Sequence, residues 1–150
     1  MNADRQLAKF MSRYTPELRA LAIDVLGRLR AQVPGAVELV YDNYNALVIG
    51  FSRSPKPSEF VGSLALYPKW VTLFFANGTR LRDPERLLQG NGKAIRSIRI
   101  TDPSALDDPA VRALIAQGFG PAKSANERVT IIQSISPKQR PRRPASRRSA

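Results

Sequence analysis

The apolar residues of the first third of the chain recur at helical spacing. Between residues 18 and 29 they lie three and four positions apart, which is typical of an amphipathic helix. Thr15 offers a hydroxyl cap and Pro16 is favoured in a first helical turn, so the pattern predicts a helix that begins there and ends before Pro34. Apolar residues between positions 7 and 11 indicate a shorter helix or turn upstream.

From residue 37 onward the apolar positions alternate, which is typical of β-strands. Residues 37–42 and 46–51 flank a short polar turn and predict a β-hairpin. Residues 60–67 and 70–75 predict a second pair of strands. Because this second pair is apolar at almost every position, we expect central strands covered on both faces.

The rest of the pattern predicts shorter elements. Asp83 is expected to cap a short helix at residues 84–88, followed by a strand at residues 96–101 and a helix at residues 109–118. Residues 129–135 are rich in β-branched side chains and predict an edge strand. Helices followed by a run of strands and another helix indicate an α+β fold with a mainly antiparallel sheet.

Charge and length divide the chain into a domain and a basic tail. At 150 residues without cysteine, it is long enough to form one domain without disulfides, which we expect at residues 1–136. Residues 137–150, here called the basic tail, hold three prolines and no acid, and we expect this tail to be disordered. Its six cations supply half of the net charge of +12 and are candidate contacts for nucleic acid: Lys138, Arg140, Arg142, Arg143, Arg147 and Arg148.

The chain contains no histidine as well as no cysteine, which removes several classes of chemistry. Thiol catalysis, thiolate or imidazole metal sites and histidine proton transfer are excluded. We therefore expect a protein that is not an enzyme and that has no cofactor or metal. No stretch approaches the roughly 20 apolar residues of a membrane span, so we expect no membrane association and a cytoplasmic location.

Gly90, Gly92 and Lys93 raise the question of a phosphate-binding loop. A Walker loop needs GxxxxGK followed by a hydroxyl residue, between a strand and a helix. Here the two glycines are only two positions apart and Ala94 follows the lysine. The spacing favours a bend between elements over a nucleotide loop.

Arg96 lies at the apolar rim of the predicted strand, where a guanidinium needs a partner. Arg96 could form a structural ion pair with Asp83 or Asp102, or pack its stem flat with the guanidinium in water. The functional alternative is an anion contact in a pocket. The aromatic residues between positions 67 and 75 leave a similar choice between a stacking platform for bases and core packing, and their apolar neighbours favour the core. Glu38 and Asp42 share one strand face, but two acids make a weak cation site.

Residues 63–100 resemble a known family. They follow the pattern V-x-L-x-F-x-x-G-x-x-L-x-D-P-x-x-L-L-x-G-x-G-K-x-x-R at Val71, Leu73, Phe75, Gly78, Leu81, Asp83, Pro84, Leu87, Leu88, Gly90, Gly92, Lys93 and Arg96. This pattern is similar to that of the YdhG-like family of small bacterial domains of unknown function, and the resemblance covers about residues 15–118. It implies a curved, mainly antiparallel sheet with packed helices, a frataxin-like shape, and the iron-chaperone role given to some relatives. A basic body and a first long helix with only Glu17 and Asp24 as acids depart from a frataxin-type iron surface.

Three hypotheses about function follow from these observations. The first is a non-enzymatic module of the small-ligand-binding or chaperone type, with four candidate pocket residues: Arg96, Lys93, Tyr41 and Trp70. The second is association with a polyanion through the basic tail, and the third is a frataxin-like iron chaperone. The sequence leaves the ligand and the oligomeric state open.

Overall fold

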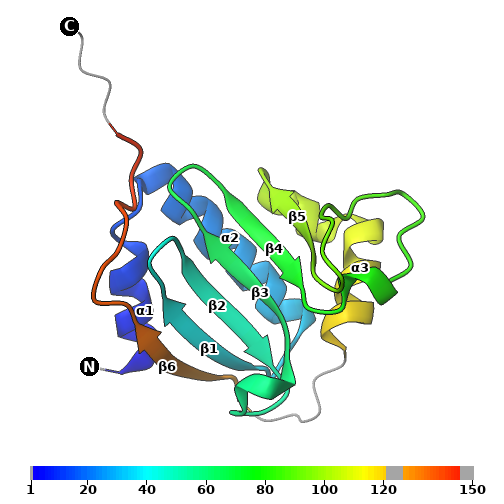
Figure 1. The fold of residues 1–150 in the computed structure, drawn as a ribbon, viewed down its shortest axis with the longest axis horizontal. Coiled ribbons are helices and arrows are strands. Elements are labelled where there is room, and N and C mark those ends of the chain that lie inside the picture. The colour runs from blue at the N-terminus through cyan, green and yellow to red at the C-terminus, as the bar shows by residue number, and fades with distance from the viewer. Residues whose placement is uncertain (1, 121–126, 146–150) are drawn as a thin grey trace, which may run out of the picture.

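The computed structural model describes residues 2–120 and 127–145, and these form two layers, a sheet and a set of helices (Figure 1). Six strands form one open sheet in the order β5-β4-β3-β2-β1-β6. All neighbouring pairs are antiparallel except β6, which runs parallel to β1. The bounds are Val37–Asp42 for β1, Leu47–Ser52 for β2, Phe60–Leu66 for β3, Val71–Phe75 for β4, Arg96–Ile100 for β5 and Val129–Ile135 for β6. The predicted α+β class with a mainly antiparallel sheet is confirmed.

Three α-helices accompany the sheet: α1 at Ala3–Met11, α2 at Pro16–Gln32 and α3 at Pro109–Phe119. The predicted start of α2 is confirmed, because the Thr15 hydroxyl accepts a hydrogen bond from the Leu18 amide at 3.2 Å. Short 3₁₀ turns occur at Pro57–Glu59, Gly78–Arg80 and Pro103–Asp107. Within the described ranges, no helix is long and apolar enough to cross a membrane.

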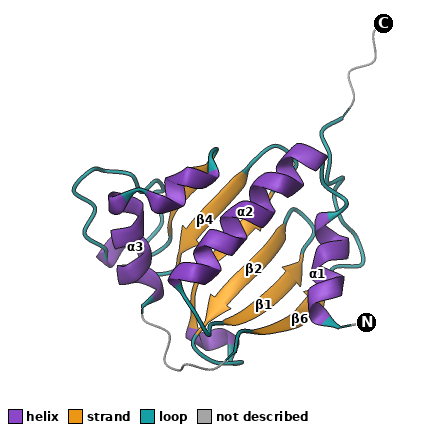
Figure 2. Ribbon diagram, turned by 180° about the vertical axis from the view of Figure 1, so that it is seen from behind, coloured by secondary structure: helices purple, strands orange, loops and turns teal. Residues whose placement is uncertain are grey.

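The hydrophobic core lies between the helices and one face of the sheet (Figure 2). Alternate strand residues such as Ile49, Phe51 and Phe75 point into it and are fully buried. Phe119 at the end of α3 meets the rings of Phe51 and Phe75 edge to face, with centroids 5.6 Å away in each case. A Cβ on Gly62 would lie 2.5 Å from the Phe119 ring, so only glycine lets α3 approach β3 this closely.

The opposite face of the sheet, here called the uncovered face, carries no helix from the described part of the chain (Figures 1 and 2). The expectation that β3 and β4 are covered on both sides is therefore wrong. Ser63, Ala65 and Thr72 occupy alternate positions on this face and are small or polar. These small residues are buried even though no second layer of helices covers them. Because they are small, the sequence does not clearly show the alternation between core-facing and outward-facing positions.

Residues 81–95 form an irregular loop, here called the glycine loop, and the helix predicted at residues 84–88 is absent. The Asp83 carboxylate accepts hydrogen bonds from the backbone amides of Leu87 and Leu88, both at 2.9 Å, and so closes the loop on itself. Arg86 has a φ of 55°, which a helix does not allow. The sequence correctly marked Asp83 as a capping residue, but its carboxylate caps a turn.

Candidate functional site

Arg96, the first residue of β5, uses its guanidinium within its own turn. Its Nη1 donates to the carbonyl oxygens of Gly92 at 2.7 Å and Ile95 at 2.8 Å. The two acids that the sequence offered as ion-pair partners are engaged elsewhere: Asp83 in the glycine loop and Asp102 on the amide and hydroxyl of its neighbour Ser104. Arg96 is thus a local structural residue in this structure.

The glycines around Arg96 explain the tight turn. A Cβ on Gly78 would lie 2.3 Å from the Arg96 Cβ, so the arginine stem fills the space above that glycine. Gly90 has a φ of 131°, a region that disfavours every other residue. Next to it, Gln89 and Ser97 exchange two backbone hydrogen bonds of 2.8 and 2.9 Å along the outer edge of β5. The loop is built for a bend, as the glycine spacing predicted.

The four predicted pocket residues lie in different places. Arg96 pairs with Phe75 in the β4–β5 register, whereas Trp70 precedes β4 and lies at the opposite end of that strand pair. Lys93 is exposed in the glycine loop, and Tyr41 lies on the uncovered face in β1. The structure does not bring these side chains into one pocket.

Trp70 instead lines a cleft of about 710 Å³ at one end of the sheet. The cleft lies between the turn that joins β3 to β4, the turn that joins β1 to β2, and the described part of the basic tail. We call it the aromatic–basic cleft, and its lining consists of Asn45, Tyr67, Pro68, Lys69, Trp70, Arg140, Pro141, Arg143, Pro144 and Ala145.

The lining of the aromatic–basic cleft combines aromatic rings with positive charge and contains no negative charge. The rings of Tyr67 and Trp70 lie 6.0 Å apart, and Trp70 is 36% exposed. The three cations of the lining, Lys69, Arg140 and Arg143, are exposed, no carboxylate is among the lining residues, and none of the three forms an ion pair with another described residue. A flat ring face beside uncompensated positive charge suits a ligand that joins a planar ring to an anionic group.

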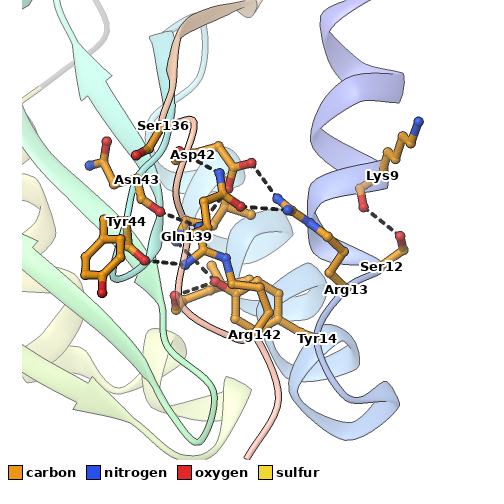
Figure 3. Close-up of polar contacts among 12 residues, drawn as sticks. Lys9, Ser12, Arg13, Tyr14, Asp42, Asn43, Tyr44, Ser136, Gln139 and Arg142 are labelled. Carbon is orange, nitrogen blue, oxygen red and sulfur yellow. Dashed lines mark hydrogen bonds and ion pairs between the residues drawn. The ribbon is translucent and has the colours of Figure 1, made fainter.

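The basic tail reaches the cleft because Arg142 anchors it (Figure 3). Arg142 is only 5% exposed, and its Nη2 donates to Asp42 Oδ1 at 2.9 Å and to the Asn43 carbonyl at 2.5 Å. Asp42, at the end of β1, is 1% exposed. A buried charge of this kind is tolerated only when it is paired, and the Asp42 carboxylate supplies the counter-charge of Arg142. The Arg142 Nε is buried without a hydrogen-bond partner.

Two further side chains complete what we call the Asp42 cluster, formed by Asp42, Arg142, Arg13 and Gln139. Arg13 forms an ion pair with the second carboxylate oxygen of Asp42. The Gln139 amide donates to the Asp42 carbonyl at 2.9 Å and accepts from Arg13 Nη1 at 2.6 Å. The four side chains therefore join the turn after α1, the end of β1 and the basic tail (Figure 3).

Tyr14 forms the floor beneath Arg142, with the guanidinium 5.9 Å from the ring centroid. Its hydroxyl donates to the Leu66 carbonyl at 2.7 Å and accepts from the Leu47 amide at 3.1 Å. Burial raises the pKa of the Tyr14 phenol above its usual value. The tyrosine thus links the anchored arginine to the ends of β2 and β3.

The sequence predicts a disordered tail, whereas residues 137–145 make hydrogen bonds with the domain in the structure. The Arg140 amide donates to the Tyr44 carbonyl at 2.8 Å, and Arg143 Nε donates to the Arg13 carbonyl at 3.0 Å. The composition of the tail shows only arginines that repel one another. It does not show that the folded domain provides a buried carboxylate, Asp42, which pairs with Arg142. Of the other predicted tail contacts, Lys138 is exposed, and Arg147 and Arg148 lie outside the described residues.

The acids that the sequence considered as cation ligands are already occupied. Glu38 is fully buried and accepts two hydrogen bonds from Arg30, at 2.7 and 2.8 Å, while Asp42 lies between two arginines. Within the described ranges there is no group of three acidic, histidine or cysteine side chains arranged to hold a metal ion. The iron role implied by the family resemblance stays a prediction.

Comparison of the chain with protein-family models, with curated proteins and with solved structures found no match. The YdhG-like resemblance therefore also stays a prediction from the sequence. What is known of the site rests on its own geometry.

Proposed function

We propose that this protein is a non-enzymatic binding module for a nucleotide-like anion, in which a planar ring carries a phosphate group. One observation carries the proposal. The aromatic–basic cleft combines the partly exposed ring of Trp70 with three cations that come from two distant segments of the chain, and its lining includes no acid.

Each part of such a ligand has a counterpart in the cleft. The planar ring would stack on Trp70 or Tyr67, and the phosphate would accept hydrogen bonds from Lys69, Arg140 or Arg143. The net charge of +12 would attract anions toward the protein. The lining offers no carboxylate, imidazole or thiol as a general base or nucleophile, which supports binding without catalysis.

The predicted role of the basic tail fits the same proposal in altered form. Arg142 is buried against Asp42 and is withdrawn from solvent, whereas Arg140 and Arg143 face the cleft. We therefore assign the anion contact to these two residues together with Lys69. A tail that acted as an extended polycation would instead use all of its arginines alike.

The proposal is tested by the fluorescence of Trp70, which is the single tryptophan of the chain. Titration with thymidine monophosphate should change this fluorescence, and thymidine without its phosphate should bind at least about tenfold more weakly. Arg140→Ala and Lys69→Ala should each weaken the monophosphate about five- to tenfold. The matched control is Arg112→Ala, which removes an exposed cation from α3 outside the cleft. Equal losses in the control and the cleft variants, or no fluorescence response to any nucleotide, would reject the proposal.

A further inference from the structure

The uncovered face of the sheet begins where the aromatic–basic cleft ends. Trp70 lines the cleft, and the guanidinium of Arg99 lies over its ring at 4.2 Å. Arg99 belongs to β5 and pairs with Thr72 of β4, whose side chain lies on the uncovered face. Trp70 and Arg99 therefore stand at the border between the cleft and the face that Figure 1 presents to the viewer.

One row of side chains crosses this face from β1 to β5. The strand registers align one residue each from β1, β2, β3, β4 and β5: Tyr41, Val48, Ala65, Thr72 and Arg99. With strands about 4.8 Å apart, the row spans about 19 Å. Its middle is low, because Ala65 and Thr72 are small and buried, and its two ends carry larger side chains.

The far end of the row is aromatic. Tyr41 and Phe60 both lie beside Gly50, since a Cβ on that glycine would be 3.6 Å from the Tyr41 ring and 3.8 Å from the Phe60 ring. Phe60 is 37% exposed. Aromatic rings therefore lie at both ends of the row. Tyr41 and Phe60 lie at one end, Trp70 lies beside Arg99 at the other, and the side chains between them are small.

The uncovered face shares with the cleft the absence of acidic side chains, and Arg99 is its cation. None of the strand residues whose side chains lie on this face is acidic. The two buried acids of β1, Glu38 and Asp42, point to the opposite face and contact arginines there. A polyanion that leaves the cleft would meet no carboxylate along the strands.

We propose that the ligand of the cleft is a segment of single-stranded nucleic acid, and that it continues from Trp70 across the row to Tyr41. The inference rests on the function proposed above and names its ligand class. Single strands expose the faces of their bases, which stack on aromatic side chains, whereas a duplex hides them. An acidic peptide would share the attraction to Arg99 but would leave the aromatic groups at the two ends unused.

The test compares a short ligand with a long one. Thymidine monophosphate fits within the cleft, whereas an octathymidylate is long enough to cross the row. We expect the octamer to bind at least about tenfold more tightly than the monophosphate and to lose affinity steeply with added salt. The readout for both is again the fluorescence of Trp70.

Matched variants at Val48, in the middle of the row and half-buried, isolate the path. Val48→Glu should weaken the octamer about fivefold and Val48→Lys should tighten it by a similar factor, because each places one charge beside the phosphates. Both should bind the monophosphate within about twofold of the parent protein, since Val48 lies outside the cleft. Changes of opposite sign cannot result from a shared loss of folding. Tyr41→Leu should weaken the octamer alone.

The outcomes separate this inference from the proposed function. If the monophosphate binds but the octamer gains nothing, or if Val48→Glu and Val48→Lys bind the octamer equally, the path across the sheet is refuted and the cleft stands. If an acidic peptide such as hexaglutamate competes as well as the octamer, the ligand class is wrong. If neither nucleotide binds, both proposals are rejected together.

Discussion

Arg142 in the basic tail and Arg96 beside the glycine loop both fix an irregular stretch of chain, and they do so with different partners. Arg142 is buried and pairs with Asp42, a carboxylate 100 positions away in the chain. Arg96 is half-buried and binds the carbonyls of Gly92 and Ile95, which belong to its own turn. The tail therefore depends on tertiary structure, whereas the glycine loop largely holds itself.

This difference also bears on the proposed function. The Asp42 cluster places Arg140 and Arg143 on the wall of the aromatic–basic cleft, so a buried ion pair holds the residues of the proposed binding surface in place. The glycine loop presents Lys93 to solvent but directs the guanidinium of Arg96 back onto its own backbone. A basic residue in an irregular segment is thus informative about ligands only once its partners are known.

The largest expected effect comes from removing the carboxylate that holds the tail. Asp42→Ala leaves Arg13 and the buried Arg142 without their shared counter-charge, and we expect the free energy of unfolding to fall by about 3–5 kcal/mol. Chemical denaturation measures the change. The control is Asp24→Ala, which removes an exposed ion pair with Arg28 and should cost at most about 1 kcal/mol. Similar losses in the two variants would mean that the Asp42 cluster contributes no more than a surface pair.

The comparison is most direct when the two arginines are truncated in parallel. Arg142→Ala should lower the free energy of unfolding by about 2–3 kcal/mol, less than Asp42→Ala because Arg13 still neutralises the carboxylate. It should also speed trypsin cleavage after Lys138, since the tail loses its anchor. Arg96→Ala should cost about 1–2 kcal/mol, because hydrogen bonds to exposed carbonyls and the packing of the outer stem near Gly78 are lost. Equal costs and equal protease sensitivity would remove the distinction between the two regions.

The region beside the glycine loop has its own sensitive point, where the turn at Gly78–Arg80 packs against the Arg96 stem. Gly78→Ala should destabilise the protein by about 1–3 kcal/mol, because the new Cβ would lie 2.3 Å from the Arg96 Cβ and 2.7 Å from its amide nitrogen. Gly92→Ala is the matched control, since no atom lies within 4 Å of its added Cβ and the change should be near zero. Thermal unfolding of the two variants checks the contrast. An unchanged unfolding temperature for Gly78→Ala would show that the turn at Gly78–Arg80 can move away from β5.

The same contrast explains which parts of the structure the sequence could predict. The helix after Thr15 and the two hairpins follow from spacing and local caps, and all three lie close to their predicted bounds. The helix at residues 84–88 failed because the Asp83 carboxylate turns to Leu87 and Leu88, which local rules do not distinguish from a helix cap. The contacts of residues 137–145 with the domain could not be predicted from the sequence, because the carboxylate that pairs with Arg142 is buried on a distant strand.

The candidate site was predicted in pieces. Trp70 and the tail arginines were each named, but their meeting in one cleft required the tail to be placed. Tyr67 was assigned with the neighbouring aromatic residues to the core, although only part of that aromatic cluster is buried: Phe75 is inside, and Trp70 is at the surface. The missed signal was the Pro68-Lys69 turn, because a hairpin turn exposes the residues on either side of it. Arg99 was missed because its partner, Trp70, lies just before the neighbouring strand β4 and far from Arg99 in the sequence.

The smallest expected effect is a change in the free energy of unfolding at alkaline pH, which comes from Tyr14 beneath Arg142 of the tail. Burial raises the pKa of the Tyr14 phenol above its ordinary value of 10.0, so the folded state holds this proton more tightly than the unfolded state. The resulting stability is fully present below about pH 10 and is lost as the pH rises through the folded pKa. Tyr14→Phe lacks the titrating group, so its free energy of unfolding should fall less steeply above about pH 10.

The control for this dependence is Tyr44→Phe, which alters an exposed ring in the turn after β1 and should leave the alkaline slope unchanged. Denaturant titrations at a series of pH values compare the three proteins. Because Tyr14 lies under Arg142, a slope that is the same in Tyr14→Phe and in the parent protein would mean that the floor of the Asp42 cluster opens to water before the phenol ionises. The tail would then be held by the ion pair itself and not by the burial that surrounds it.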